Sequence, residues 1–507
     1  MRLADTLAAL SLATDLAMGQ PPEKAIRAAV LATEMARHLG LDEPAVADVL
    51  YTTLLKHLGC TATSHEEVTL FGPDDLGARP VAERTDDANL REMLGLFGTV
   101  GRGTGLGRVA YLARAAVGAK GATERIFRAV CEVGTRMAAR LGLGAEVERG
   151  LSEALERWDG KGAPHGLRGE DIGMGVRIAE PATQAVIFHR LGGIDAALAM
   201  AHRRSGGWFD PASVEALRAI GPDVLARLEE EDPWEVLLEA EPSPVREIGP
   251  AGLDRVAEVF ADMVDLKSPY LLGHSSGVAG LAAAAAERLG LPDPAALRRA
   301  GLLHDLGRIA VATGTWEKPG PLSTTEWEQV RLHPYHTERI LERAESLRPI
   351  ARIAGMHHER QDGSGYHRGS TAAEAPPEAR VLAVADAYQA MTQDRPHRKA
   401  RTPSEAAARI ETTARDGRFD PECARGVLEA AGRPATRARG AWPSGLSDRE
   451  VEVLRMVSRG LTNKQIAAAL VISPRTAEHH VQHIYGKIGT STRAAAAMFA
   501  MEHGLLR

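Results

Sequence analysis

Seven histidine and aspartate side chains in the second half of the chain are of the types that bind divalent metal ions. They include two adjacent pairs, and in chain order they are His274, His304, Asp305, His333, His357, His358 and Asp386. Imidazoles and carboxylates suit metals such as iron, manganese and zinc. Successive helical side chains project about 100° apart, so an adjacent His-Asp pair can reach two neighbouring metals or two positions around one. Because any one of these histidines alone is more simply explained as a boundary residue, the prediction depends on the whole set.

The elements that must position these residues are predicted to be helices. Residues 292–307 (PDPAALRRAGLLHDLG) space their apolar positions as a helix does, and Ser323 three residues before Glu326 is the signature of a capping box. Strand candidates are short, and ARVLAVA at 379–385 fits a buried helix equally well. Aromatic residues make up only 4% of the chain and alanine is abundant, which favours helices over sheets. We therefore expect a mostly all-α fold.

Two breaks that contain proline and glycine divide the chain of 507 residues. They lie at residues 241–252 and 432–444, where periodic apolar positions are scarce. The expected domains are 1–240, 253–431 and 445–507. Three domains is the number expected at roughly 100–200 residues per domain.

The first two domains share four landmarks in the same order, which indicates a tandem duplication. LLKHLG at 54–59 matches LLHDLG at 302–307, and RWDGKG at 157–162 matches RQDGSG at 360–365. The other two matches are ARHLGL with AERLGL, at 36–41 and 286–291, and GWFDP with GRFDP, at 207–211 and 417–421.

Two motifs in the second copy carry a family resemblance. HDLGR at 304–308 and HHERQDGSGYH at 357–367 are accompanied by GHSSGVA at 273–279, HP at 333–334 and AVADAYQAMTQDRP at 383–396. In order and spacing this set resembles the HD superfamily of metal-dependent phosphohydrolases, and specifically its HD-GYP branch. The resemblance covers residues 255–430.

The resemblance implies that the seven residues bind two divalent metal ions, iron or manganese, with Asp305 bridging them. Two such ions can activate water and stabilise both the attacking and the leaving oxygen of a phosphate displacement. The implied substrate is a cyclic dinucleotide such as cyclic di-GMP, a nucleotide second messenger, or a related phosphoester. Asp305 and Arg308 are expected to act in catalysis. Substrate contacts are expected from Arg308, Asp362, Gly363, Gly365 and Tyr366, although the glycines also fit plain turn chemistry.

Three positions depart from the family pattern. Arg308 replaces a lysine, and His367 replaces the proline that follows Gly-Tyr. An arginine can hold phosphate but is not a simple substitute for lysine, and the loss of proline removes a rigid point from the loop. Tyr270 stands where three-metal members have glutamate, so we expect two metals.

The first copy lacks the ligands. On the shared landmarks, the positions of His274, His304, Asp305, His357 and His358 are taken by Lys24, Lys56, His57, Ala154 and Leu155. A lysine ammonium repels a metal cation rather than binding it. We therefore expect residues 1–240 to be a degenerate HD-type helical domain without an equivalent metal site.

The C-terminal segment, residues 445–506, has three helical blocks separated by GLT and SPR. Ser473 followed by Pro474 predicts a helix start, and an apolar stripe follows at Ala477, Val481, Ile484 and Ile488. Hydrogen-bond donors on the opposite face suit reading of the DNA major groove.

This segment resembles the LuxR/GerE-type helix-turn-helix, a four-helix domain without a wing. The resemblance makes 462–470 the supporting helix and 474–488 the recognition helix on double-stranded DNA. The expected DNA contacts are Lys464, Arg475, Thr476, His479 and Lys487. The final helix, residues 493–504, has a face of small residues on which dimers of this family form, so a homodimer is expected.

Charge and composition fit this organisation. Residues 432–507 hold eleven Lys and Arg against five Asp and Glu, so the C-terminal segment is basic although the whole chain carries −6. A basic tail indicates a nucleic-acid partner, although a solvated surface gives the same charge. The three cysteines are far apart, and we find neither a secretion leader nor a membrane helix, so a cytoplasmic protein is expected.

Two functions remain open at this point. In one, the protein is a metal-dependent phosphohydrolase fused to a transcription regulator. In the other, it is a regulator whose HD-GYP-like domain senses a nucleotide without hydrolysing it. The complete ligand set favours the first, and Arg308 with His367 favours the second or another substrate.

Overall fold

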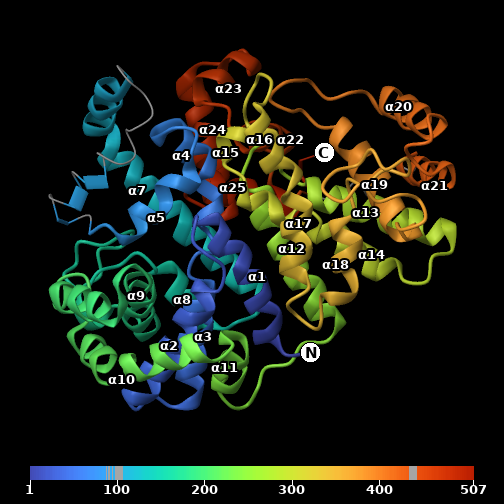
Figure 1. Cartoon of the computed structure of the whole chain (residues 1–507). Coiled ribbons are helices and arrows are strands. Elements are labelled where there is room, and N and C mark those ends of the chain that lie inside the picture. The colour runs from blue at the N-terminus through green and yellow to red at the C-terminus, as the bar shows by residue number, and fades with distance from the viewer. Residues whose placement is uncertain (87, 90–91, 94, 97–106, 433–441, 507) are drawn as a thin grey trace. The chain divides into compact units, whose positions relative to one another are not determined.

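Helices account for all the regular structure in the part of the chain that is described. The computed structural model describes residues 1–86, 88–89, 92–93, 95–96, 107–432 and 442–506 (Figure 1). β-Pairing among these residues is limited to isolated bridges, such as that of Asp362 with Thr371. The prediction of a mostly all-α fold is confirmed. The chain forms two compact units, Met1–Arg255 and Val256–Arg507.

The first unit is a helical assembly around α2. Its α-helices are α1 (Leu3–Ala17), α2 (Lys24–His38), α3 (Glu43–Leu55), α4 (Ser64–Phe71), α5 (Asp75–Arg84), α7 (Gly107–Leu141), α8 (Ala145–Ser152), α9 (Met174–Arg204), α10 (Pro211–Glu230) and α11 (Pro233–Ala240). Short 3₁₀ turns, η1 (Cys60–Thr63) and η3 (Gly169–Asp171), lie between them. A core of buried apolar side chains from α2, α3, α9 and α10 fills the centre. The helix α12 (Pro250–Asp265) begins in this unit and ends in the next.

The second unit repeats this plan and adds four C-terminal helices. Its first part contains α13 (His274–Leu289), α14 (Pro294–Leu303), η4 (Leu306–Ala310), α15 (Thr313–Trp316), α16 (Thr324–Arg331), α17 (His333–Leu341), α18 (Arg348–Gly355), α19 (Pro377–Met391), α20 (Pro403–Arg415) and α21 (Pro421–Ala431). The last part contains η5 (Pro443–Gly445), α22 (Asp448–Ser458), α23 (Asn463–Leu470), α24 (Pro474–Ile488) and α25 (Arg493–Glu502). Residues 433–441 of the expected second linker lie outside the described residues.

Local sequence signals explain where several of these helices begin. Ser323 and Glu326 form the predicted capping box at the start of α16, and Ser473 caps α24 with Pro474 at its first position. The ambiguous segment 379–385 is helical and lies within α19. It is buried because α19 packs against α13, α18 and α21, so its continuous apolar run reflects a core helix rather than a strand.

The same helix pairings occur in both units. In the first, α2 packs against α3, α9 and α10, and α7 packs against α8 and η1. In the second, α13 packs against α14, α19 and α21, and α17 packs against α18 and η4 (Figure 1). These matched contacts are what an internal duplication produces.

In each unit, a buried carboxylate accepts a hydrogen bond from the backbone at the start of the central helix. Asp15 accepts a hydrogen bond of 3.1 Å from the backbone N–H of the residue after Lys24, and Asp265 accepts one of 3.0 Å from the residue after His274. Burial raises the pKa of Asp15 to about 7 and that of Asp265 to about 8. Lys24 therefore occupies in the first unit the position that His274 occupies in the second, as the sequence landmarks predict.

A glycine brings two segments into close contact in each unit. A side chain at Gly59 would overlap with the backbone carbonyl of Val130, and one at Gly307 would overlap with that of His333. Val130 is thus the first unit's counterpart of His333, and it has no metal-binding atom.

Ion pairs fill the interior of the first unit at the positions of the missing ligands. Lys24 Nζ lies 2.8 Å from Glu83 Oε1, His57 Nε2 lies 3.0 Å from the same oxygen, and Lys56 pairs with Glu180. All five side chains are at most 9% exposed. Although burial opposes ionisation, Lys24 and His57 hold the pKa of Glu83 well below its usual range. The positive charge in this interior comes from lysine side chains.

No helix in the described part of the chain combines the length and the apolar character that crossing a bilayer requires.

We expect Gly307→Ala to destabilise the chain by about 3 kcal/mol, because the added methyl must displace the His333 backbone in a packed interior. The matched control is Gly280→Ala in α13, where an added methyl meets no atom within 4 Å. That variant should gain about 0.5–1 kcal/mol from reduced backbone freedom. Thermal unfolding followed by circular dichroism measures both, and equal stabilities of the two variants would contradict the close approach.

Glu83→Gln should cost the first unit about 3 kcal/mol, because it leaves Lys24 buried without a charged partner. The lowered pKa of Glu83 stabilises the fold fully above the unfolded value of 4.5, and this contribution is lost progressively as the pH falls through the lower folded-state pKa. The deficit of the variant should therefore shrink below pH 4.5. Urea unfolding across this range tests the claim. The control is Glu215→Gln, whose exposed pair with Arg218 should change stability by less than about 1 kcal/mol.

Candidate metal centre

The seven predicted ligands converge in the second unit from five helices. His274 is the first residue of α13, His304 and Asp305 follow the end of α14, and His333 is the first residue of α17. His357 and His358 follow α18, and Asp386 lies within α19. Six of the seven are buried, and only His358, with 15% of its side chain exposed, reaches toward the surface.

Asp305 stands at the middle of the cluster and faces two pairs of histidines with its two oxygens. Its Oδ2 lies 3.5 Å from His274 Nε2 and 3.3 Å from His304 Nε2. Its Oδ1 lies 3.4 Å from His333 Nε2 and 3.5 Å from His357 Nε2. A carboxylate in this arrangement can bridge two cations.

Asp386 joins both sides of the cluster as well. Its Oδ1 lies 3.2 Å from His274 Nε2 and 3.8 Å from His304 Nε2, and its Oδ2 lies 3.6 Å from His358 Nδ1. The donors thus form one group of His274, His304 and Asp386 and another of His333, His357 and His358. Asp305 lies between the groups.

Backbone carbonyls orient three of the imidazoles. The Nδ1 atoms of His304, His333 and His357 lie 2.8, 2.6 and 2.6 Å from the carbonyl oxygens three residues before them. A carbonyl can only accept, so each Nδ1 carries a proton and each Nε2 is turned toward the cluster. The lone pairs of His333 and His357 face each other at 3.0 Å, an arrangement that calls for a cation or a proton between them.

The unsatisfied atoms of the cluster fit a divalent metal. His304 Nε2 and both oxygens of Asp305 are buried without a hydrogen bond of good geometry. Buried polar atoms are normally paired, so these atoms indicate a partner of another kind. Imidazole nitrogens and carboxylate oxygens are the donors that iron, manganese and zinc accept.

The electrostatics of the cluster also favour a cation. Although burial opposes ionisation, Arg308 and His304 hold the pKa of Asp305 well below its usual range. Burial lowers the pKa of His274 and of His333 to about 4, so both are neutral, as ligands must be. Burial disfavours charge on His304 too, but Asp305 outweighs this and raises its pKa to about 10. The buried carboxylates thus retain a proton on His304 in place of other positive charge.

Two arginines flank the cluster. Arg308 Nε lies 2.8 Å from Asp305 Oδ2, and its guanidinium stacks 4.6 Å above the ring of Trp316. Arg395 donates to the Tyr270 carbonyl at 2.8 Å, and its second terminal nitrogen lies 3.4 Å from His274 Nδ1. Burial and the nearby Arg308 lower the pKa of Arg395 to about 10, so it remains charged at neutral pH. Both cations are suited to hold an anionic substrate.

Sequence reasoning missed Arg395 and Gln393. Gln393 Oε1 lies 2.9 Å from His274 Nδ1 and therefore orients this imidazole. Both residues stand in the motif at 383–396, but they follow the end of α19 in a loop. Helical periodicity gives no signal for a loop residue that contacts a helix more than 100 positions earlier.

The predicted substrate-binding turn divides into one part that meets the cluster and one that does not. The Tyr366 ring lies 4.5 Å from the His358 ring. Asp362 is exposed, and its carboxylate accepts from the backbone and hydroxyl of Ser364 within the turn. A side chain at Gly365 would crowd Glu359, and Gly363 has a φ of +74°, so both glycines are required by the turn itself.

His367 has a backbone that proline cannot adopt. Its φ is +65°, whereas the proline ring fixes φ near −65°. The loop after Tyr366 therefore follows a course that excludes the proline of the family pattern.

The C-terminal helices α22–α25 form a separate core. Ala477, Val481, Ile484 and Ile488, the predicted apolar stripe of α24, are all buried in it. The bounds of α23 and α24 agree with the predicted supporting and recognition helices, the first starting one residue later.

Four of the five predicted DNA contacts are exposed: Lys464, Arg475, Thr476 and His479. Lys487 is engaged within the chain, because its Nζ donates to Glu450 at 2.8 Å and to the Gly445 carbonyl at 3.0 Å. His483 Nδ1 lies 2.8 Å from the same carboxylate. These bonds hold α24 against the start of α22.

Family models match two segments of the chain. Residues 258–423 match the HD domain, and residues 444–500 match the bacterial regulatory proteins of the luxR family. The second match covers α22–α24 and most of α25.

Characterised relatives extend the match over most of the chain. It is 31% identical to the 3′3′-cGAMP-specific phosphodiesterase 3 of Vibrio cholerae over 428 residues, which is 83% of this chain and 93% of that protein. A cyclic di-GMP phosphodiesterase of Pseudomonas aeruginosa is 36% identical over 187 residues, 36% of this chain and 45% of that protein. The crystal structure of a cyclic GMP-AMP-specific phosphodiesterase of V. cholerae superposes with a TM-score of 0.60 at 27% identity, covering 86% of this chain and all of that one. The chain therefore belongs to the HD-GYP family of metal-dependent HD-domain phosphodiesterases, and it carries a C-terminal LuxR-type helix-turn-helix domain.

Proposed function

We propose that the seven-residue cluster binds two divalent metal ions, iron or manganese, and that the enzyme opens a 3′,3′-linked cyclic dinucleotide. The observation that carries this proposal is the position of Asp305, whose two oxygens each face a different pair of histidine Nε2 atoms. One ion would be held by His274, His304 and Asp386, the other by His333, His357 and His358, with Asp305 shared. The names of the relatives support this substrate class, because they include enzymes for cyclic di-GMP and for cyclic GMP-AMP.

When bound, two such metals supply an activated water and neutralise charge on a phosphate. The chain's own residues orient the substrate. Arg308 and Arg395 hold permanent positive charge beside the cluster and can bind the non-bridging phosphate oxygens. Tyr366 covers His358 and borders the more open side of the cluster. The carbonyl bonds at Nδ1 keep the imidazoles in place during turnover.

The first unit has another role in this proposal. We take residues 1–240 as a degenerate HD-type domain, because lysines stand at two ligand positions and ion pairs fill the interior. Residues 253–431 form the phosphodiesterase domain and 445–507 the DNA-binding domain, joined by linkers at 241–252 and 432–444. The degenerate domain supplies fold or regulation rather than chemistry.

The C-terminal domain binds double-stranded DNA in this proposal, with Arg475 and His479 nearest the bases and Lys464 near phosphate. A LuxR-type domain reads paired half-sites as a dimer, so we propose a homodimer that works in the cytoplasm, where the DNA is. Binding or cleavage of the nucleotide would change how this domain is presented to its operator.

A second function is favoured by one specific contact. Arg308 is already paired with Asp305, and His367 stands in a loop that differs from the family pattern. A domain with these features can bind a nucleotide as a signal without cleaving it. The regulator would then be a sensor.

Metal content and turnover separate the two functions. The purified protein should carry about two transition metals per chain and cleave cyclic di-GMP or cyclic GMP-AMP. His304→Ala combined with Asp305→Ala should abolish both, because it removes one histidine ligand and the shared carboxylate. Mass spectrometry of the metals and chromatography of the products measure the two effects. The matched control is His336→Ala in α17, which is not part of the cluster and should retain both.

If the protein contains metal but cleaves no cyclic dinucleotide, the result would support the second function, that of a nucleotide sensor. Full metal content in the double variant would contradict the proposed ligands.

Arg475→Ala should weaken binding to the specific operator by ~1–3 kcal/mol and relax base preference, as expected for a lost base contact. Arg449→Ala is the matched control, since it removes the same charge from α22, where Arg449 pairs with Glu452. Fluorescence anisotropy with specific and random duplexes distinguishes the two variants. Equal losses on both duplexes would mean that Arg475 contacts only phosphate.

A further inference from the structure

An exposed tryptophan lies at the end of a row of aromatic rings that starts at the metal centre. The His358 ring lies 4.5 Å from that of Tyr366, with an angle of 31° between them. The Trp327 ring meets Tyr366 edge to face at 5.8 Å. Trp327 itself is 43% exposed. The three rings lead from the candidate ligand to solvent.

The helix that carries Trp327 is fixed with respect to the centre. Its N-terminus is closed by the capping box of Ser323 and Glu326, and Lys318 binds both oxygens of Glu326 at 2.9 and 2.6 Å. At its other end, only one residue separates α16 from His333. Trp327 therefore cannot move far without disturbing either this cap or a candidate ligand.

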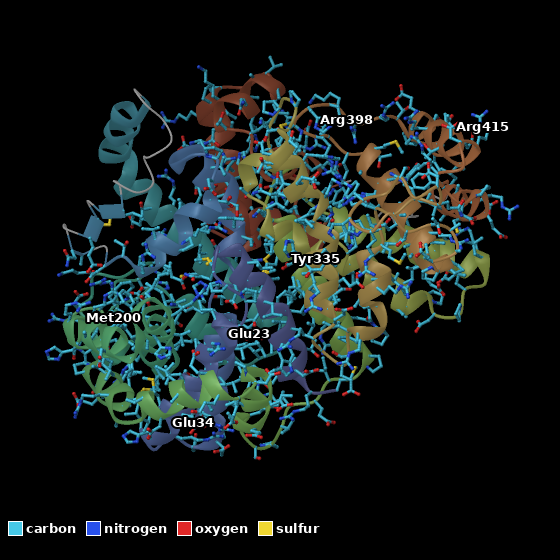
Figure 2. All side chains as sticks on the ribbon, viewed as in Figure 1. Glu23, Glu34, Met200, Tyr335, Arg398 and Arg415 are labelled. Atoms are coloured by element: carbon cyan, nitrogen blue, oxygen red, sulfur yellow. The ribbon has the colours of Figure 1, made fainter. Side chains whose placement is uncertain are left out.

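Two more large apolar side chains close to Trp327 in the sequence are exposed. Leu332 is 44% exposed and Tyr335, which is labelled in Figure 2, is 42% exposed. Most large apolar side chains of the described residues are buried, so three exposed ones within nine positions are unusual. A flat aromatic ligand would cover indole surface that water now contacts.

We propose that Trp327 stacks on one nucleobase of the bound cyclic dinucleotide. This inference rests on the proposed function and identifies a residue that binds the substrate's base. The phosphate at the centre and the base at Trp327 would be bound together, because His358, Tyr366 and Trp327 are consecutive neighbours. Every base has a π-face, so stacking here strengthens binding of any purine and does not select guanine over adenine. Tyr366 provides the edge against which the indole is held.

The test compares cleavage of a cyclic dinucleotide with cleavage of methyl 4-nitrophenyl phosphate, a diester without a nucleobase. Trp327→Ala should raise KM for the cyclic dinucleotide on the order of 10-fold, with the main effect in KM rather than kcat. The ratio of kcat/KM for the dinucleotide to that for the small diester should fall by a similar factor. Trp327→Phe should restore most of the loss, because a phenyl ring still stacks. Glu328→Ala, on the same helix and with a side chain 58% exposed, is the matched control and should keep the wild-type ratio.

Each result has one meaning. An unchanged ratio in Trp327→Ala, while the wild type cleaves the dinucleotide, overturns the stacking role and leaves the proposed function intact. Equal losses on both substrates also overturn it, because they indicate that the tryptophan only supports the fold of the centre. A wild type that cleaves the small diester but no cyclic dinucleotide overturns the proposed substrate, and this inference with it.

Discussion

The second unit is organised around the cost of burying two ionised carboxylates. Asp305 and Asp386 are at most 3% exposed, and an isolated charge in such a place is strongly unfavourable. Five histidines surround them with Nε2 or Nδ1 atoms between 3.2 and 3.8 Å away. Burial keeps His274 and His333 neutral, so these imidazoles do not balance the two negative charges. In the proposed function, bound divalent metal ions would supply positive charge here, and the same residues would serve both stability and catalysis.

In the first unit, ion pairs take the corresponding interior positions. Lys24 and Lys56 stand where the second unit has His274 and His304, and their ammonium groups pair with Glu83 and Glu180. Glu83 comes from α5, which lies between the LLKHLG and RWDGKG landmarks of the first copy. A lysine ammonium group supplies positive charge without a cofactor, but it has no open position at which a water or a substrate could be coordinated. The first unit therefore has internal ion pairs at the positions that the predicted ligands take in the second.

Sequence reasoning succeeded where residue type and spacing determine the outcome. The seven predicted ligands lie together, the bounds of α24 agree with the predicted recognition helix, and the capping box of Ser323 is present. It failed for side chains whose role depends on contacts across the fold. Gln393 and Trp327 contact partners more than 35 positions away, which helical periodicity does not reveal. The left-handed backbone at His367 was likewise invisible, although the missing proline marked the position.

The turn at residues 157–162 recurs at 360–365, but only the second copy has a histidine pair before it. The contacts of the two turns explain this difference. Glu156 accepts backbone hydrogen bonds from residues 165–167, and Glu359 accepts them from residues 368 and 370. Each glutamate is crowded by a turn glycine, Gly162 or Gly365, that leaves no room for a side chain.

These residues close the loop over the core, so their loss would cost stability in either unit. The side chains of the two residues before each glutamate accept none of these backbone hydrogen bonds. Ala154 is buried and Leu155 is half-buried in one copy, whereas His357 and His358 lie in the candidate metal centre in the other. Within one motif, the acidic residue and the glycines therefore hold the loop, whereas the adjacent histidines and the tyrosine lie at the candidate metal centre.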